Sequence, residues 1–293
     1  MDTKIIKGKT KIIEGKTKQI ESLDDPSLVR IKTKDSLTAN DAAIQADLPV
    51  AQDKTTQNCN VMYHLKKAGI PVAYKMRNDL TSFIAENCKM IPIECVIRRR
   101  PFGSYLKREP SKTSSDIFDP LLTEFFHKHA IVCNRHLGNE MMLEYIARNL
   151  YLRNGKWTET VYTDPLIEPS DDTWSLFPPK QPRHDMQPLK VIRPEVDPVT
   201  LEYIRRSLMI PCFEILEKAW KKFDVELIDM KIEVGINQNK EIVIADVIDN
   251  DSWRIWPNGD PKKQLDKQSF RDGEKLTRVQ EKYAIVTQYT KKF

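Results

Sequence analysis

The clearest pattern of apolar and polar residues lies between residues 227 and 256. Residues 227–234 alternate between the two types with a period of two, which predicts a strand with its charged side chains on one face. Residues 241–248 are rich in Ile and Val and predict a second, well-buried strand. The polar residues 237–240 between them predict a tight turn, so the whole segment is interpreted as a β-hairpin.

Periodicity also predicts the remaining elements of the chain. Apolar residues three and four apart predict helices over residues 54–69, which Gly69 ends, over 198–223, with a kink near Pro211, and over 275–293. Short apolar runs predict strands at residues 28–32, 71–75, 82–84 and 91–97. Residues 35–50 are interpreted as a strand end that leads into a loop. The proline density around residues 157–182 predicts an ordered or semi-rigid loop and no helix.

The predicted hairpin carries several carboxylates at neighbouring positions. Asp229 and Glu233 flank Lys231 on one face of the first strand, and Asp246 lies near the end of the second. Buried carboxylates need compensation, and a magnesium ion held by oxygen ligands would supply it. The alternative is a solvated amphipathic hairpin whose charges all face water.

Composition narrows the class of protein. The 293 residues, 40% hydrophobic and 30% charged, suffice for a sizeable core in about two lobes. No apolar run reaches about 18 residues and the start of the chain lacks a signal-peptide core, so no membrane partner is expected. Five scattered cysteines without a CxxC pair predict reduced thiols in a cytoplasmic protein. The net charge of +5 suits anionic small substrates, and nucleic-acid binding is disfavoured because no aromatic residues interleave with a basic stripe.

A short repeat near the start, IIKGKTK followed by IIEGKTK, offers candidate phosphate ligands. Gly8 and Gly15 are seven residues apart, which is not the spacing of a Walker loop, and the chain continues as a strand. A Gly-Lys-Thr-Lys turn between strands can still cover phosphates with backbone N–H groups and lysines. In the first copy, Lys9 and Lys11 are interpreted as surface charge.

Residues 98–108 form a second basic segment, with Arg98 and Ser104 on either side of Gly103. Arginine offers a planar fork and serine a hydroxyl, so the array suits a phosphate group. A charged edge strand that resists aggregation is the alternative interpretation.

Three segments together resemble one known family. LIDMKIEVG followed by EIVIADVIDNDSWRIW, MIPIECVIRRRPFGSYLKR at 90–108, and EGKTKQI at 14–20 resemble, in order, segments of the SAICAR synthetase (phosphoribosylaminoimidazole-succinocarboxamide synthase) family. The resemblance implies an α+β fold of two lobes, with ATP in the cleft between them. The implied lobes are an antiparallel, ATP-binding N-terminal lobe at residues 1–92 and a larger α/β lobe at residues 93–293. The latter carries the proline-rich insertion at about 155–195.

The resemblance also implies an activity. The family is an ATP-dependent carbon–nitrogen ligase of de novo purine biosynthesis. It joins L-aspartate to 5-amino-1-(5-phosphoribosyl)imidazole-4-carboxylate (CAIR) to give SAICAR, ADP and phosphate, with an acyl phosphate as the expected intermediate. The implied cofactors are ATP, as substrate, and Mg²⁺, and a homo-oligomer is possible. A small-molecule or inositol-phosphate kinase is the rival interpretation.

Carried over position by position, the resemblance implies a set of site residues. The expected ATP-binding residues are Gly15, Lys16, Thr17, Lys18 and Met90; the catalytic residues Asp229 and Lys231; the metal ligands Glu233 and Asp246; and the substrate-binding residues Asp41, Arg98, Ser104, Arg254, Lys267 and Arg271.

One segment departs from the family pattern. The family carries a lysine directly after two apolar residues, whereas this chain has His127 there and Lys128 one position later. Either residue is therefore a candidate for the lysine's role. The histidines at 127–136 are spaced too loosely for a zinc site.

Overall fold

The computed structural model describes residues 2–5, 11–39, 44–128, 130–134, 141–145, 159–182 and 186–293. Its contacts divide the chain into two compact units, Met1–Met90 with Ile210–Phe293, and Ile91–Met209. Both combine helices with antiparallel strands, which confirms the predicted α+β class. Because residues 210–293 group with the N-terminal part, these units differ from the lobes expected at 1–92 and 93–293, and that division by function remains a prediction.

The first unit contains an antiparallel sheet close to the one that the sequence predicts. Its order is β1 (Asp2–Ile5), β2 (Lys11–Glu14), β3 (Lys18–Ser22), β4 (Leu28–Thr33), β8 (Ser82–Glu86) and β7 (Tyr74–Arg77). The loop predicted within residues 35–50 is wrong, because β5 (Ser36–Ala39) pairs with β6 (Ile44–Asp47). The strand predicted at 71–75 begins only at Tyr74.

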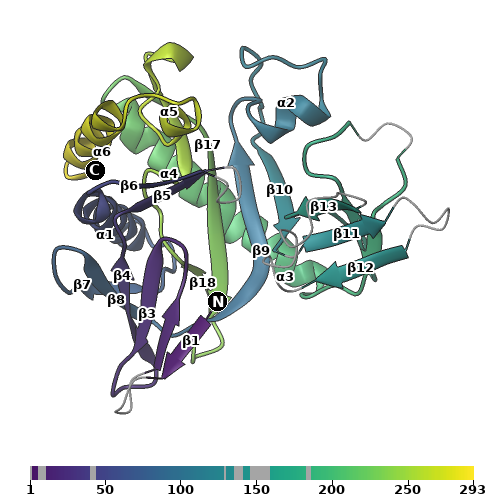
Figure 1. Ribbon diagram of the computed structural model, residues 1–293, viewed down its shortest axis with the longest axis horizontal. Coiled ribbons are helices and arrows are strands. Elements are labelled where there is room, and N and C mark those ends of the chain that lie inside the picture. The colour runs from purple at the N-terminus through teal and green to yellow at the C-terminus, as the bar shows by residue number, and fades with distance from the viewer. Residues whose placement is uncertain are drawn as a thin grey trace. The chain divides into compact units, whose positions relative to one another are not determined.

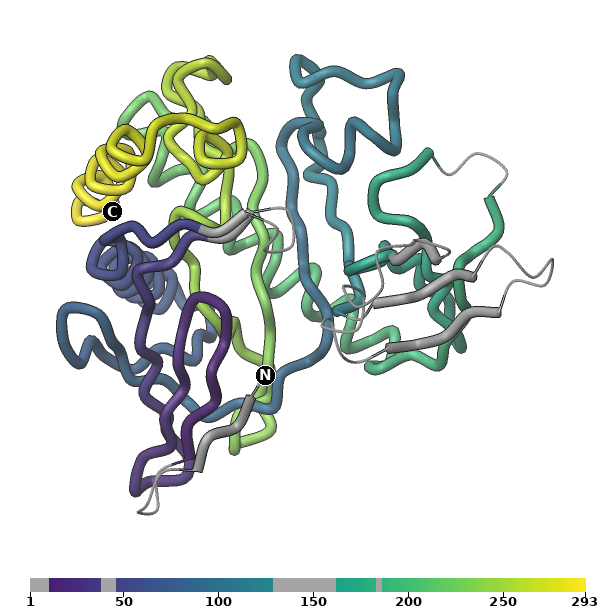
Figure 2. Tube along the Cα trace, in the orientation of Figure 1, coloured from purple at the N-terminus to yellow at the C-terminus, as the bar shows by residue number. Residues whose placement is uncertain are grey.

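Two helices from opposite ends of the sequence lie side by side in this unit (Figure 1). Gln57 of α1 (Ala51–Lys67) donates to the carbonyl oxygen of Tyr283 in α6 (Leu276–Thr290) at 2.9 Å. Figure 2 shows the same neighbourhood as a yellow coil beside the dark blue trace of α1. As predicted, α1 ends before Gly69, whose φ of 87° suits a residue without a side chain.

The predicted hairpin is present as β17 (Val225–Ile236) and β18 (Ile242–Ala245), and β19 (Trp253–Pro257) pairs with residues 225–230 of β17. Lys240 N donates to Asn237 O at 3.1 Å, which closes the predicted turn. The second strand is shorter than the predicted 241–248. Asp246 has a φ of 66°, and this left-handed conformation ends the extended backbone.

The second unit holds a sheet in the order β16 (Lys190–Ile192), β15 (Trp174–Phe177), β14 (Leu166–Pro169), β10 (Leu122–His127) and β9 (Lys89–Arg98). A smaller sheet has β11 (Ala130–Asn134) between β12 (Met141–Tyr145) and β13 (Glu159–Thr163). The prediction of a loop around residues 157–182 is therefore wrong, because three strands lie there. Pro165 and Pro169 stand just before and at the end of β14, where a proline does not interrupt a ladder of hydrogen bonds.

The helix predicted at 198–223 is interrupted, as expected, close to Pro211. It consists of α3 (Pro198–Tyr203), a π-helical turn at Ile204–Met209, and α4 (Ile210–Lys221). Proline has no backbone N–H to donate and crowds the preceding turn, which favours such a change of hydrogen-bond register. The remaining elements are a short α2 (Ser104–Arg108), a 3₁₀ turn at Pro261–Lys263, and α5 (Gln268–Arg271).

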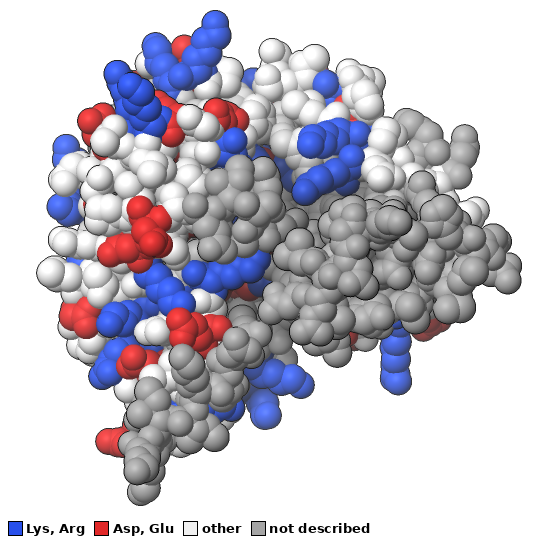
Figure 3. Space-filling view, in the orientation of Figure 1, with Lys and Arg blue, Asp and Glu red and all other residues white. Residues whose placement is uncertain are grey.

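Among the described residues, no helix is both long enough and apolar enough to cross a membrane. On the face drawn in Figure 3, the described acidic and basic side chains of the first unit are interspersed.

Candidate active site

The first strand of the hairpin presents three charged residues from one face. Asp229, Lys231 and Glu233 alternate with Met230, Ile232 and Val234, which are all buried. The ammonium of Lys231 lies 3.9 Å from a carboxylate oxygen of Glu233. The regular alternation of apolar residues therefore sets the spacing of the charges, as the sequence predicts.

A β-bulge aligns Asp229 with Arg254. Leu227 pairs with Ile255 and Asp229 with Arg254, so Ile228 is an extra residue on β17. Arg254 Nη1 donates to Asp229 Oδ1 at 2.9 Å and to Oδ2 at 2.7 Å. The side chain of Asp229 is only 5% exposed, so this charge pair is largely shielded from solvent.

Asp246 connects the hairpin to the Gly15–Lys18 turn. Its carboxylate forms an ion pair with the ammonium of Lys18, and both side chains are mostly buried. Glu233 stands opposite Ala245, the residue before Asp246, so the two predicted metal ligands lie at adjacent positions of the strand pair. The structure thus brings together the turn predicted to hold phosphates and the carboxylates predicted to hold magnesium.

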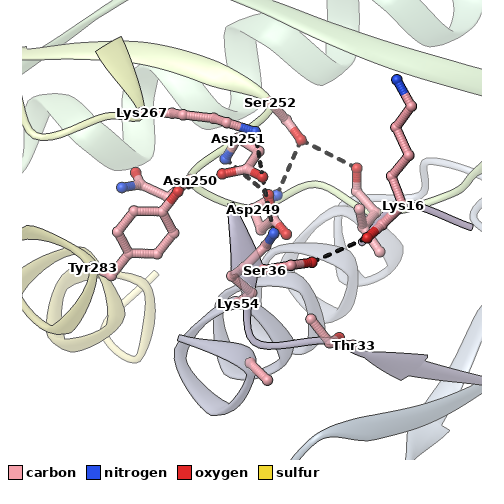
Figure 4. Close-up of polar contacts among 12 residues, drawn as sticks. Lys16, Thr33, Ser36, Lys54, Asp249, Asn250, Asp251, Ser252, Lys267 and Tyr283 are labelled. Carbon is pink, nitrogen blue, oxygen red and sulfur yellow. Dashed lines mark hydrogen bonds and ion pairs between the residues drawn. The ribbon is translucent and has the colours of Figure 1, made fainter. Parts of the chain in front are cut away.

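The Gly15–Lys18 turn is fixed through its backbone. Gly15 N donates to Lys18 O at 2.9 Å, and Lys34 Nζ donates to Gly15 O at 2.9 Å and to Glu14 Oε1 at 2.5 Å. Ser36 Oγ donates to Lys16 O at 3.0 Å, while the Lys16 side chain is exposed. Figure 4 shows that this side chain extends away from its own backbone contacts. A rigid turn with a projecting lysine is suited to an anionic ligand.

A buried charged cluster supports the segment after Asp246 (Figure 4). Asp251 Oδ2 accepts from Lys54 Nζ and from Lys267 Nζ, each at 2.9 Å, and its other oxygen accepts from the hydroxyl of Tyr283. Lys54 is 2% exposed and Lys267 is 7% exposed. One carboxylate therefore joins α1, α6 and the residue that precedes α5.

The cluster changes the acidity of its members. Burial acts to raise the pKa of Asp251, but the ammonium groups of Lys54 and Lys267 hold it well below its usual range. Burial and the charge of Asp251 raise the pKa of Asp249, although Lys54 opposes the change. Burial lowers the pKa of the Lys267 ammonium, against the attraction of Asp251. Asp251 is therefore the ionised centre of the cluster.

Asp266 fixes the start of α5, which follows Lys267 directly and ends at Arg271. Its two carboxylate oxygens accept from Ile255 N at 3.0 Å and from Gln268 N at 2.8 Å. Burial raises the pKa of this carboxyl group. The predicted substrate residues Lys267 and Arg271 thus stand on a segment that is anchored to β19.

The second unit holds the predicted phosphate segment. Arg98 Nε donates to Glu124 Oε2 at 2.7 Å, and the arginine is buried. Ser104 begins α2 directly after Gly103, whose φ of 61° confirms the predicted turn. The structure thus places Arg98 and Ser104 on adjoining elements of one unit.

Four further predictions concern residues at the margins of these sites. Asp41 lies outside the described residues. Met90 is exposed and lies close to Gly235, because a Cβ built on that glycine would stand 3.2 Å from the Met90 sulfur. His127 is buried against Trp174, whereas Lys128 is exposed. The choice between His127 and Lys128 remains open.

Magnesium fits the donor atoms of the hairpin only in part. Within the described residues, no group of three or more His, Cys, Asp or Glu side chains is arranged to hold a metal. Glu233 and Asp246 supply hard carboxylate oxygens, which magnesium prefers. A metal at these two residues would therefore need oxygen ligands from water or from substrate phosphates.

Sequence reasoning missed the cluster around Asp251. Lys54 and Tyr283 lie 197 and 32 residues from Asp251 along the chain, so no local spacing announced the contacts. The contact of Glu124 with Arg98 and Arg108 in the second unit was missed for the same reason. The relevant physical signal is the cost of burying the ammonium of Lys54 in α1 without an acidic partner.

Comparison with known proteins gives matches along nearly the whole chain. The SAICAR synthetase family model matches residues 11–164 and 183–289. Over 277 residues the chain is 38% identical to the chicken protein named multifunctional protein ADE2, covering 94% of this chain and 53% of that protein. Over 272 residues it is 33% identical to a phosphoribosylaminoimidazole-succinocarboxamide synthase of Chloroflexus aurantiacus. This match covers 91% of this chain and 89% of that protein. The chain spans about half the length of the chicken relative.

Solved structures with the same fold include a SAICAR synthetase (type 2) in complex with ADP, at a TM-score of 0.68, 20% identity and coverage of 96% of this chain and 98% of that one. A SAICAR synthase from Saccharomyces cerevisiae complexed with SAICAR gives a TM-score of 0.60 at 15% identity, with coverage of 100% and 98%. These likenesses confirm the predicted fold.

Proposed function

Because the chain belongs to the SAICAR synthetase family, we propose that it joins L-aspartate to the carboxylate of CAIR, with conversion of ATP to ADP and phosphate. Two of the similar structures are named as complexes with ADP and with SAICAR, and we propose the same ligand classes here. The observation that supports the proposal most strongly is the meeting of Lys18 with Asp246, which joins a phosphate-binding turn to a carboxylate pair.

The reaction follows from the chemistry of a carboxylate, which is a poor electrophile because its oxygen leaves badly. A carboxylate oxygen of CAIR attacks the γ-phosphorus of ATP, the bond to ADP breaks, and an acyl phosphate forms. The aspartate nitrogen then attacks the acyl carbon, loses its proton, and displaces phosphate as the carbon–oxygen bond breaks. The protein contributes mainly orientation and electrostatic stabilisation.

The residues divide the tasks by charge. Gly15 and Thr17 offer backbone to the phosphates, Lys16 and Lys18 neutralise them, and Met90 lies against the adenine. Asp229 and Lys231 orient the reacting carboxylate, with Arg254 fixed beside them. Lys267 and Arg271 bind anionic groups of the substrates, and Arg98 and Ser104 bind the ribotide phosphate. Asp41 is proposed as a further substrate contact.

Glu233 and Asp246 are the residues that would hold Mg²⁺. The bound ion would neutralise charge on the phosphates during transfer. Without an ion, Lys18 partly compensates Asp246, and Lys231 lies close enough to compensate Glu233. These lysines hold the two carboxylates in place. Substrate phosphates would then supply the further oxygen ligands of the ion. The cytoplasmic location and any homo-oligomer stay predictions.

The direct test measures ADP release with each substrate omitted in turn. We expect rapid ADP release only when ATP, CAIR and L-aspartate are all present, with SAICAR formed in equal amount. A small-molecule kinase would instead release ADP without aspartate and leave a stable phosphorylated product, which would contradict the proposal.

A further inference from the structure

Glu124 joins two arginines in the second unit. On the antiparallel pair of β9 and β10, Arg98 stands opposite Leu122, and Glu124 stands opposite Val96. Arg98 and Glu124 are therefore diagonal neighbours on the same face, within reach of each other's long side chains. The 2.7 Å bond from Arg98 Nε to Glu124 Oε2 uses this placement.

The second oxygen of Glu124 reaches α2. Glu124 Oε1 accepts from Nη2 of Arg108, the last residue of α2, and Arg108 Nη1 also donates to Pro179 O at 2.7 Å. Ser104 is the first residue of the same one-turn helix. Glu124 thus connects the strand that carries Arg98 to the helix that carries Ser104.

The two guanidinium groups are held in a shielded place. Arg98 is 3% exposed and Arg108 is 2% exposed. Their central carbons lie 5.9 Å and 5.6 Å from the centre of the Tyr105 ring, which packs edge-on against Phe118. Glu124 accepts from both buried guanidinium groups, so one carboxylate sets the orientation of two arginines.

We infer that Glu124 and Arg108 are positioning residues that hold Arg98 and Ser104 in place for a phosphate monoester. This inference rests on the proposed function, in which Arg98 and Ser104 bind the ribotide phosphate. Glu124 accepts from Nε of Arg98, and the carbonyl oxygen of Phe102 accepts from Nη1 at 3.4 Å, so the plane of the guanidinium is fixed from two sides. Arg108 fixes Glu124 in turn and ties down the helix that begins with Ser104.

The variant Glu124→Gln tests the inference because it keeps the shape of the side chain and removes its charge. We expect the KM for CAIR to rise by about tenfold or more, since a charge-assisted contact loses its orientation. The KM values for ATP and aspartate should stay within about twofold of the wild type. Arg108→Lys keeps the charge but loses the fork, and should raise the KM for CAIR by a smaller factor.

Glu202→Gln is a matched control in the same unit. Glu202 also pairs with two arginines, with Arg205 at 2.6 Å and with Arg206, but on the exposed surface of α3. We expect this variant to leave every KM unchanged. If it raised the KM for CAIR as strongly as Glu124→Gln, the effect would not depend on the phosphate segment and the inference would be wrong.

A role limited to folding predicts a different pattern. It would lower the fraction of active protein, and thus the apparent kcat for all substrates, without a selective change in the KM for CAIR. Glu124→Asp retains the charge and should recover most of the affinity for CAIR. If Glu124→Gln does not unfold cooperatively, Glu124→Asp and Arg108→Lys are used in its place. A rise in their KM for CAIR alone then supports the inference. An unchanged KM for CAIR in folded variants would overturn the inference.

A binding measurement separates failure of the inference from failure of the proposed function. Calorimetric titration with ribose 5-phosphate needs no turnover. We expect binding to the wild type that weakens about tenfold in Glu124→Gln and is unchanged in Glu202→Gln. If the wild-type protein makes no SAICAR but the two variants show these ribose 5-phosphate affinities, the proposed function is refuted and the phosphate site is supported. If the wild type makes SAICAR but both variants bind ribose 5-phosphate equally well, the inference alone is refuted. The same holds if an active wild type does not bind ribose 5-phosphate.

Discussion

Arg254 Nη1 donates to both carboxylate oxygens of Asp229, at 2.9 and 2.7 Å, and the two residues are direct partners across β17 and β19. The bulge at Ile228 creates this register, because uninterrupted pairing from Leu227 and Ile255 would place Asp229 opposite Trp253. The pair therefore fixes one charge at the centre of the proposed site while leaving Lys231 and Glu233 in regular alternation.

Removing the charge of Asp229 should impair the chemistry more than the fold. In Asp229→Asn the amide cannot replace the charged contact to Arg254, so we expect kcat to fall by about ten- to a hundredfold. Steady-state kinetics with all three substrates measures this. Glu226→Gln, on the exposed part of the same strand, is the control and should retain wild-type kinetics. Equal activity of both variants would contradict the role of Asp229.

Lys16, on the turn after β2, and Lys11, the first residue of β2, provide a matched pair of exposed lysines. Lys16 stands on the turn that the contacts of Lys34 and Ser36 fix, so Lys16→Ala should raise the KM for ATP by about tenfold. Lys11→Ala should change it by less than about twofold, since it removes only surface charge. Initial rates at varied ATP distinguish the two. An equal response would place the ATP phosphates elsewhere.

The proposed metal ligands can be tested without straining the backbone. Asp246 has a left-handed φ of 66°, which asparagine adopts more readily than most residues. Asp246→Asn should therefore fold normally, and, like Glu233→Gln, should lose most turnover and need more Mg²⁺ for what remains. Rates over a range of Mg²⁺ concentrations report this. Wild-type turnover at limiting Mg²⁺ in either variant would refute the assignment.

Asp251→Asn should destabilise the first unit. Lys54 would stay buried with its main anionic partner gone, which costs roughly 3–5 kcal/mol of unfolding free energy at neutral pH. Asp24→Asn changes an exposed carboxylate and should have little effect. Urea unfolding at pH 7 compares the three proteins, and a wild-type midpoint for Asp251→Asn would contradict the account.

The same variant predicts a pH dependence. Because the pKa of Asp251 is depressed in the folded protein, its stabilisation is complete above the unfolded pKa of about 4 and is lost as the pH falls toward the folded pKa. Asp249 and Asp266, whose pKa values are raised, act in the opposite direction but are present in both proteins. The difference in unfolding free energy between the wild type and Asp251→Asn should therefore become smaller below about pH 4. A gap that stays constant from pH 7 to pH 3 would be inconsistent with an ionised Asp251.

Local patterns predicted the elements that carry the proposed site. Strict alternation located Asp229, Lys231 and Glu233 on one face of a strand, and the apolar run located the strand before Asp246. Alternation could not reveal the bulge at Ile228, because an extra apolar residue fits the pattern on either face. It also could not reveal that Asp246 turns the chain, since aspartate is compatible with both a strand and a left-handed residue.

Contacts between distant segments were beyond the reach of local patterns. Lys54 belonged to a predicted helix, yet it is buried with Asp251. Glu124 lay outside every predicted element, yet it joins two arginines. The proline-rich segment misled for a related reason. Proline disfavours the interior of a sheet, but residues 159–192 place prolines at strand ends and pair through the residues between them.

Transfer of oxygen from CAIR to phosphate tests the central claim most directly. CAIR labelled with ¹⁸O in its carboxylate is incubated with ATP, Mg²⁺, L-aspartate and the protein, and the products are analysed by mass spectrometry. We predict one ¹⁸O in each released phosphate and the other in the new amide of SAICAR, because ATP activates the carboxylate that aspartate then attacks. Unlabelled phosphate, or label retained in a phosphorylated ribotide without incorporation of aspartate, would contradict the account.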